Sequence, residues 1–268
     1  MANINVPSES ALQSKNNMVR AIQDLYWIVK DLSSGSGGEV EQQIEKLNSE
    51  VYSLKKAVGD LGGAVTFEFP DASGKSFNTL MGNNGTVKLS EDVTTSRFGP
   101  GILAKNNVTL DLAGHNIEFT NAAASGAVQA RGTMVMTIKG KGIFDAGNGI
   151  AVMCNGKDAV INLTGSTTTY QTDRPNAELV YCYAGTINIS GGTFRNNGSQ
   201  YMLNCYDANY RNGTAKIIVT GGKFYDFNPA DNTAEGEHTS FLAEGYKATA
   251  STVIEEGVEH TVYTVSRA

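Results

Sequence analysis

The chain has 268 residues, of which 40% are apolar and 18% are charged, and its formal net charge is −6. This composition predicts a folded protein and excludes wholesale disorder. The acidic balance argues against sequence-independent binding of nucleic acid, which needs a basic face. No window approaches the roughly 18 apolar residues of a membrane span. The first ten residues also lack the basic and apolar regions of a secretory signal. We therefore expect no nucleic-acid partner, no membrane span and no export signal.

The first predicted region, residues 1–38, is an anchoring helix followed by a linker. Apolar residues from Met18 to Leu32 recur at alternating gaps of four and three, which is a helical period. The Ser/Gly run at 33–38 has the composition of a flexible linker. We expect the helix to dock on other proteins of a larger assembly, although a short bundle with copies of itself explains it equally well. The docking residues would be Met18, Ile22, Leu25, Tyr26, Trp27 and Val29.

Residues 39–61 continue the helical period as a heptad seam. The seam residues are Val40, Ile44, Leu47, Val51, Leu54, Val58 and Leu61. β-Branched residues at the a positions and mostly Leu at the d positions are typical of a coiled coil, and by themselves favour two strands. The alternative is an amphipathic helix packed on its own domain. We predict oligomerisation through the seam.

From residue 62 the helical period ends and a shorter repeat begins. Five β-rich runs end at Gly114, Gly140, Gly165, Gly191 and Gly221, at spacings of 26, 25, 26 and 30 residues. Two further β-type runs recur between them, at 117–119, 143–144, 193–194 and 223–224, and at 127–129, 150–154, 179–183 and 202–206. Propeller blades need about 40 residues, and a β-sandwich gives no reason for a 25-residue phase.

The repeat therefore predicts a mainly β fold, a right-handed parallel β-helix of about 5–6 coils over residues 62–230. Residues 231–268 would form a C-terminal cap. Within it, residues 252–265 read as two alternating strands around Glu255, Glu256 and Gly257, and thus as a hairpin. Because an open β-helix end exposes unpaired strand edges, we expect this hairpin to cover the last coil.

Two segments of the repeat region resemble known proteins. Residues 85–93 and Val108–Ile117 look like the opening coil of pectate-lyase-like β-helix proteins. Residues 221–231 and 234–247 resemble the last module of many bacteriophage fibre proteins. A helical anchor ahead of such a β-helix is typical of phage head and tail fibres.

The resemblance implies a structural virion protein, made in the host cytoplasm and incorporated into the particle. It would dock on other virion proteins by its N-terminus and project the β-helix for host attachment or capsid decoration. By analogy with such fibres we expect a homotrimer, whereas the heptad residues favour a dimer. The distal partner would be a bacterial-surface glycan or protein.

Three cysteines occupy the same strand in consecutive repeats. Cys154, Cys182 and Cys205 are therefore expected to form one ladder of small apolar side chains in the core. A line of thiols about 4.8 Å apart lacks the converging directions of a zinc site. We predict no metal site and no cofactor.

Polysaccharide cleavage is the natural alternative activity for this fold. It would need paired carboxylates or a base with an electrophilic partner. The charged residues considered do not share one strand column, so we predict no catalytic site. They are Asp145, Asp158, Asp173, Glu178 and Asp207, with Arg174, Arg195 and Arg211. A glycan-binding protein or a cell-surface adhesin stays open, but the adhesin would need an export or sorting signal.

Tyrosine and asparagine gather between residues 170 and 212. Exposed tyrosines with amide partners suit recognition of carbohydrate or protein, because the ring stacks and the amide hydrogen-bonds. The alternative is an aromatic ladder within and beside the coil core. The candidate ligand surface is Tyr181, Tyr183, Tyr206, Tyr210 and Asn209.

Overall fold

The computed structural model describes residues 85–89, 91–95, 102–104, 107–120, 126–173, 178–196 and 201–268, together with the backbone of β1 (Thr66–Phe69). All of these except parts of β1 and β2 (Gly85–Leu89) belong to one compact unit. The anchoring helix, the linker and the coiled coil predicted over residues 1–61 lie outside the described residues. Within the described ranges, no helix is long and apolar enough to cross a membrane.

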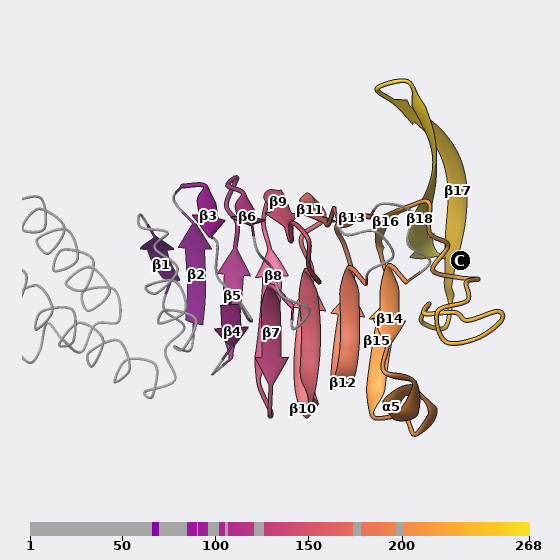
Figure 1. Ribbon diagram of the computed structural model, residues 1–268, viewed down its shortest axis with the longest axis horizontal. Helices are drawn as coiled ribbons and strands as arrows, with labels where there is room; N and C mark the ends of the chain where they lie inside the picture. The colour runs from indigo at the N-terminus through magenta and orange to yellow at the C-terminus, as the bar shows by residue number, and fades with distance from the viewer. Residues whose placement is uncertain are drawn as a thin grey trace, which may run out of the picture. The chain divides into compact units, whose positions relative to one another are not determined.

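The unit is a parallel β-solenoid of about four turns (Figure 1). The sequence period thus predicted the solenoid correctly but gave too many coils. A full turn needs all three strands, and the last glycine run leads into the C-terminal segment instead of another coil. The right-handed sense of the winding stays a prediction.

Two of the three strands in each turn belong to one large sheet. Its first column contains β4 (Ile102–Ala104), β7 (Val128–Arg131), the first halves of β10 (Val152–Leu163) and β12 (Val180–Ile189), and β14 (Leu203–Cys205). Its second column contains β2, β5 (Val108–Asp111), β8 (Val135–Lys139), the second halves of β10 and β12, and β15 (Ala215–Val219). β10 and β12 are long strands that each run through both columns. The register between them shifts after Cys154, where the chain passes from the first column to the second.

The third strand of each turn belongs to the second sheet. In order along the solenoid it contains β3 (Val93–Thr95), β6 (Ile117–Phe119), β9 (Gly142–Asp145), β11 (Thr168–Gln171), β13 (Thr193–Arg195) and β16 (Gly222–Tyr225). The antiparallel strands β18 (Val258–Arg267) and β17 (Tyr246–Glu255) then extend this sheet. Of the parallel strands in this sheet, the sequence repeat predicted β6, β9, β13 and β16 but neither β3 nor β11.

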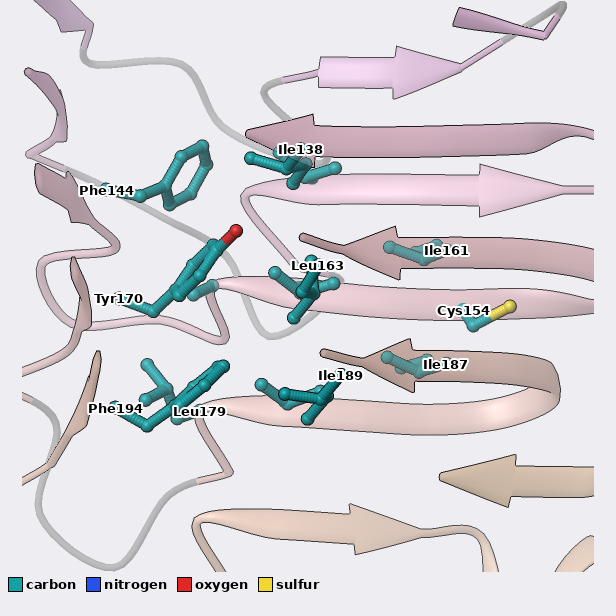
Figure 2. Packing of buried hydrophobic residues seen from close by; sticks show 14 of the residues in the cluster. Ile138, Phe144, Cys154, Ile161, Leu163, Tyr170, Leu179, Ile187, Ile189 and Phe194 are labelled. Atoms are coloured by element: carbon teal, nitrogen blue, oxygen red, sulfur yellow. The ribbon is translucent and has the colours of Figure 1, made fainter. Parts of the chain in front are cut away.

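The core lies between the two sheets and is built of ladders. Apolar residues of the second column pair in register, with Ile138 beside Leu163 and Leu163 beside Ile189. Facing them, aromatic rings of the second sheet form another ladder, in which Phe144, Tyr170 and Phe194 follow one another (Figure 2). The ring centroids of Tyr170 and Phe194 lie 5.1 Å apart, and those of Phe194 and Phe224 lie 4.8 Å apart. Equivalent residues thus stack because each coil repeats the one before it.

The repeated glycines serve two different purposes at the corner. Gly140 has φ +93°, a left-handed backbone that favours glycine. Gly221 has no such conformation, but a Cβ there would collide with the carbonyl oxygen of Ser190 in the preceding coil. The five periodic glycines therefore do not share one backbone geometry. The structure places some at left-handed turns and others where consecutive coils approach too closely for a side chain.

Each strand of the last turn has a partner at its outer edge, a full strand for β16 and single contacts for β14 and β15. The β16 edge pairs with β18, with Phe224 opposite Tyr263. The β15 edge receives the segment around Leu242, as the Val219 amide donates to the Phe241 carbonyl at 2.8 Å. The β14 edge receives the Glu235 carboxylate, which accepts the Cys205 amide. The hairpin is longer than residues 252–265, and it covers only one of the three edges.

The hairpin is fastened to the solenoid by a polar network. Its turn residues Glu256 and Gly257 both have positive φ, as a two-residue type I′ turn requires. Beside the turn, the Glu255 carboxylate accepts two hydrogen bonds from the Arg195 guanidinium, at 2.7 and 2.9 Å. The Arg195 guanidinium also lies 3.7 Å from the centre of the Tyr225 ring, whose hydroxyl donates to Glu255 at 2.8 Å.

Candidate functional site

The candidate ligand surface lies on the outer side of the first strand column, over β12 and β14. Residues of a strand point alternately to the two faces of a sheet. Because Cys182 is buried in the core, its neighbours Tyr181 and Tyr183 point outward. In the next coil Cys205 is buried in register with Cys182, and Tyr206 follows it on the exposed side. We call Tyr181, Tyr183, Tyr206 and Tyr210 the tyrosine face.

The centre of the tyrosine face is a stacked pair of rings. The centroids of Tyr183 and Tyr206 lie 4.8 Å apart with 21° between the ring planes. Their relative exposures are 39% and 41%, so the pair is a large aromatic surface that remains in water. A stacked pair is held rigid by its own contact. Little side-chain entropy would therefore be lost when a ligand packs on it.

A short helix, α5 (Asp207–Arg211), brings the remaining predicted residues to this face. The Tyr210 ring is 36% exposed, and partial burial raises the pKa of its hydroxyl. Asn209 has another role, because its side-chain amide donates to the Tyr183 carbonyl oxygen at 2.6 Å. Asn209 therefore fastens α5 to β12, while its contact with a ligand stays a prediction.

Tyr181 is less exposed than the other three tyrosines of the face. It is half-buried, and burial raises the pKa of its hydroxyl to about 12, with a further contribution from nearby Glu178. In the register it stands beside Met153 on one side and Asn204 on the other. The sequence placed Tyr181 on the correct face of the sheet. It could not show how much of the ring its neighbours cover.

A residue that the sequence did not single out, Glu235, completes the site. Burial raises the pKa of its carboxyl group, and nearby Asp207 raises it further. One carboxylate oxygen accepts the Cys205 amide, while the other is buried and has no hydrogen-bond partner among the described residues. Glu235 follows the last coil and has no equivalent in the repeat, so no sequence period could have located it.

A second buried acceptor lies close by. The amide nitrogen of Asn204 donates to Glu178 at 3.4 Å, but its oxygen has no hydrogen-bond partner among the described residues. Buried acceptors without partners are uncommon in folded proteins. The Asn204 and Glu235 oxygens lie beneath the tyrosine face, where a buried water molecule that donates hydrogen bonds would satisfy them.

The charged residues considered for catalysis are mostly engaged in local contacts. Asp145 accepts hydrogen bonds from the Gln171 side chain at 2.6 Å and from the Gly147 amide at 2.7 Å. Arg195 is held by Glu255, as described above, and Arg211 lies 3.8 Å from Asp207 on α5. Asp158 is exposed at a strand bend, and Arg174 lies outside the described residues. Of the set, Glu178 and the α5 residues Asp207 and Arg211 lie at the tyrosine face.

The cysteines lie where the sequence placed them. Cys154 is in register with Cys182, and Cys182 with Cys205, and all three are buried free thiols. Hydrogen bonding to Cys182 and burial both raise the pKa of Cys154, so the thiol stays protonated and unreactive. Among the described residues, no group of three or more His, Cys, Asp or Glu side chains is arranged to hold a metal ion.

Comparison of the chain with protein-family models, with curated proteins and with solved structures finds no match. The predicted docking residues Met18, Ile22, Leu25, Tyr26, Trp27 and Val29 lie outside the described residues. The heptad residues 40–61 lie outside them as well. The site that can be argued from geometry is therefore the tyrosine face.

Proposed function

We propose that this protein is a structural virion component, a phage head or tail fibre that attaches to a bacterial surface or decorates the capsid. In this proposal residues 1–61 dock the chain and gather three copies. The β-solenoid then projects outward, and the tyrosine face meets the ligand. The parallel solenoid and the resemblance of its first and last coils to pectate-lyase-like and phage fibre proteins support the architecture.

The observation that carries the attachment role is the exposed Tyr183–Tyr206 pair. Two stacked rings at about 40% exposure present an apolar surface in a solenoid whose other large aromatic side chains are mostly buried. Sugars stack on such rings through their C–H faces, and protein loops pack on them in the same way. Glu178, Glu235 and Asp207 stand near this pair with one cation, Arg211, so carboxyl groups outnumber it, which favours a neutral or amino sugar over a uronic acid.

The test is binding of the full chain to a panel of bacterial surface polysaccharides. Tyr206→Ala removes half of the stacked pair, and we expect it to weaken binding about tenfold, the equivalent of about 1.4 kcal/mol. Ile143→Ala is the matched control, because Ile143 is 39% exposed but lies on β9 of the other sheet. Equal loss in both variants, or none in Tyr206→Ala, would contradict the attachment role of this face.

Glycan cleavage is the second candidate function, and Glu235 favours it specifically. A raised carboxyl pKa and a neighbouring carboxylate, that of Asp207, are two features of a general acid in glycoside hydrolysis. The same panel distinguishes the two functions, since an enzyme would release reducing ends or unsaturated products over time. The fibre proposal expects binding without product, and it expects Glu235→Gln to leave the amount of product unchanged at background.

A further inference from the structure

The β17 strand is the outer edge of the second sheet. Its ten residues pair on one side with β18, and among the described residues no strand pairs with its other side. In Figure 1 the yellow hairpin of β17 and β18 stands at the C-terminal end of the strand series, with β17 outermost. Its outward-facing amide and carbonyl groups are therefore available to another strand.

This edge lacks the devices by which folded proteins usually block strand pairing. Protected edges carry lysine in mid-strand, proline, or a β-bulge that breaks the line of backbone groups. Residues 248–254 contain no charge and no proline, and β17 pairs with β18 over ten consecutive residues without a register shift. Ile254 on this strand is 70% exposed. The outer edges of β14, β15 and β16 each have a partner over at least part of their length, whereas among the described residues the β17 edge has none.

We propose that β17 pairs antiparallel with β17 of a second copy of the chain, across a twofold axis at Ser251. In an antiparallel pair, residues that exchange hydrogen bonds must both point their backbone groups toward the partner strand. Along β17 the backbone groups of every second residue point toward the partner strand. The two copies have the same sequence, so the same residue numbers point outward in both. A residue with an odd number must therefore lie opposite another odd one, and an even one opposite an even one. The axis must consequently pass through a residue and not between two.

Charge selects which residue lies on the axis. With Ser251 on the axis, Lys247 lies opposite Glu255 of the second copy, and by symmetry the ion pair occurs at both ends. The Glu255 carboxylate, which Arg195 of its own chain already holds, would then accept a second cation. Ile254 then lies opposite Ala248, which covers its exposed side chain. With Ala250 on the axis, Lys247 would lie opposite Val253, and no such ion pair would form. Shape alone permits both registers, but complementary charge favours Ser251.

This contact goes beyond the proposed function and does not depend on it. A twofold pairing at the C-terminal hairpin is distinct from the oligomerisation predicted for residues 40–61. In a trimeric fibre it would join chains of neighbouring fibres, because a threefold axis cannot place all three edges in twofold pairs.

The test is disulfide cross-linking of the full chain. In Ser251→Cys, the two cysteines on the axis would lie within the Cα separation of about 4.4–6.8 Å that a disulfide needs. We expect mild oxidation to give a band of twice the chain mass. The native cysteines do not compete, because all three are buried. Glycan binding by the tyrosine face is scored separately and can fail without affecting this result.

Three controls fix the register. Thr249→Cys alone would place the two thiols about 13 Å apart, given roughly 3.3 Å per residue, and should not cross-link. A mixture of Thr249→Cys and Val253→Cys chains should cross-link, because these residues lie opposite each other in the proposed register. The absence of a Ser251→Cys dimer would overturn the proposal. So would an equal yield from Thr249→Cys, or cross-linking through Ala250→Cys in place of Ser251→Cys.

Discussion

Tyr170 is the one polar member of an otherwise phenylalanine ladder in the second sheet. Its side chain is fully buried between Phe144 and Phe194, and its hydroxyl makes no hydrogen bond among the described residues. Burial raises the pKa of this hydroxyl, and nearby Thr168 offsets the rise only in part. The Thr168 hydroxyl is itself engaged with the carbonyl oxygen of Gly140. A buried hydroxyl without a partner lowers stability, because folding removes it from water.

We therefore expect Tyr170→Phe to raise the free energy of unfolding by about 1 kcal/mol, measured by urea denaturation of the full chain. The ring and its stacking are kept, and only the unpaired hydroxyl is lost. Phe144→Tyr is the matched control, since it adds a hydroxyl at the preceding rung of the same ladder and should lower the free energy. A loss of stability in Tyr170→Phe would mean that the hydroxyl has a partner in solution.

At the scale of single elements, the β17–β18 hairpin depends on charge for its attachment. The hydrogen bonds from Arg195, followed by that from Tyr225, lower the pKa of Glu255 to about 2, from an ordinary value of 4.5. A carboxyl group whose pKa is lower in the folded state stabilises that state when it is ionised. This contribution is complete above about pH 4.5 and is lost as the pH falls toward 2.

Glu255→Gln should accordingly destabilise the protein most near neutral pH. The difference in urea midpoint between the native chain and the variant should shrink steadily below about pH 4.5, as Glu255 becomes protonated in the unfolded and then in the folded chain. Glu259→Gln, on the exposed side of the same hairpin, is the control and should show little difference at any pH. A Glu255→Gln effect that does not change with pH would show that the charge is unimportant.

The sequence predicted the strands whose apolar residues follow the repeat and missed strands whose residues do not. The β15 strand was found because Ile217 and Val219 alternate with outward residues, as in the coils before it. The β11 strand was missed because its buried positions hold Thr168 and Tyr170, which do not read as an apolar alternation. At the site, Tyr183 and Tyr206 follow from alternation around the cysteines, whereas Glu235 comes from a segment outside the period.

At the scale of the whole molecule, the proposed fibre role makes a prediction about the oligomeric state. A fibre with this role should be threefold, so we expect light scattering of a dilute solution to give the mass of three chains. Ile44→Asp would place a charge in the predicted heptad seam and should abolish the trimer, leaving single chains or pairs joined through β17. A native mass of two chains that Ile44→Asp reduces to one would favour the pairing indicated by the heptad residues. A monomeric native chain would contradict the coiled coil.

The α5 helix shows where one turn of such a solenoid can gain or lose residues. It lies between β14 and β15 in the last turn, where the glycine spacing rises to 30 residues. The added residues project outward, while Cys205 and Val219 keep their places in the ladders. The number of residues in one turn can therefore change at this corner while the register of the core ladders stays the same. New surface loops, including those that carry recognition residues such as Tyr210, can be gained or lost there without repacking the interior.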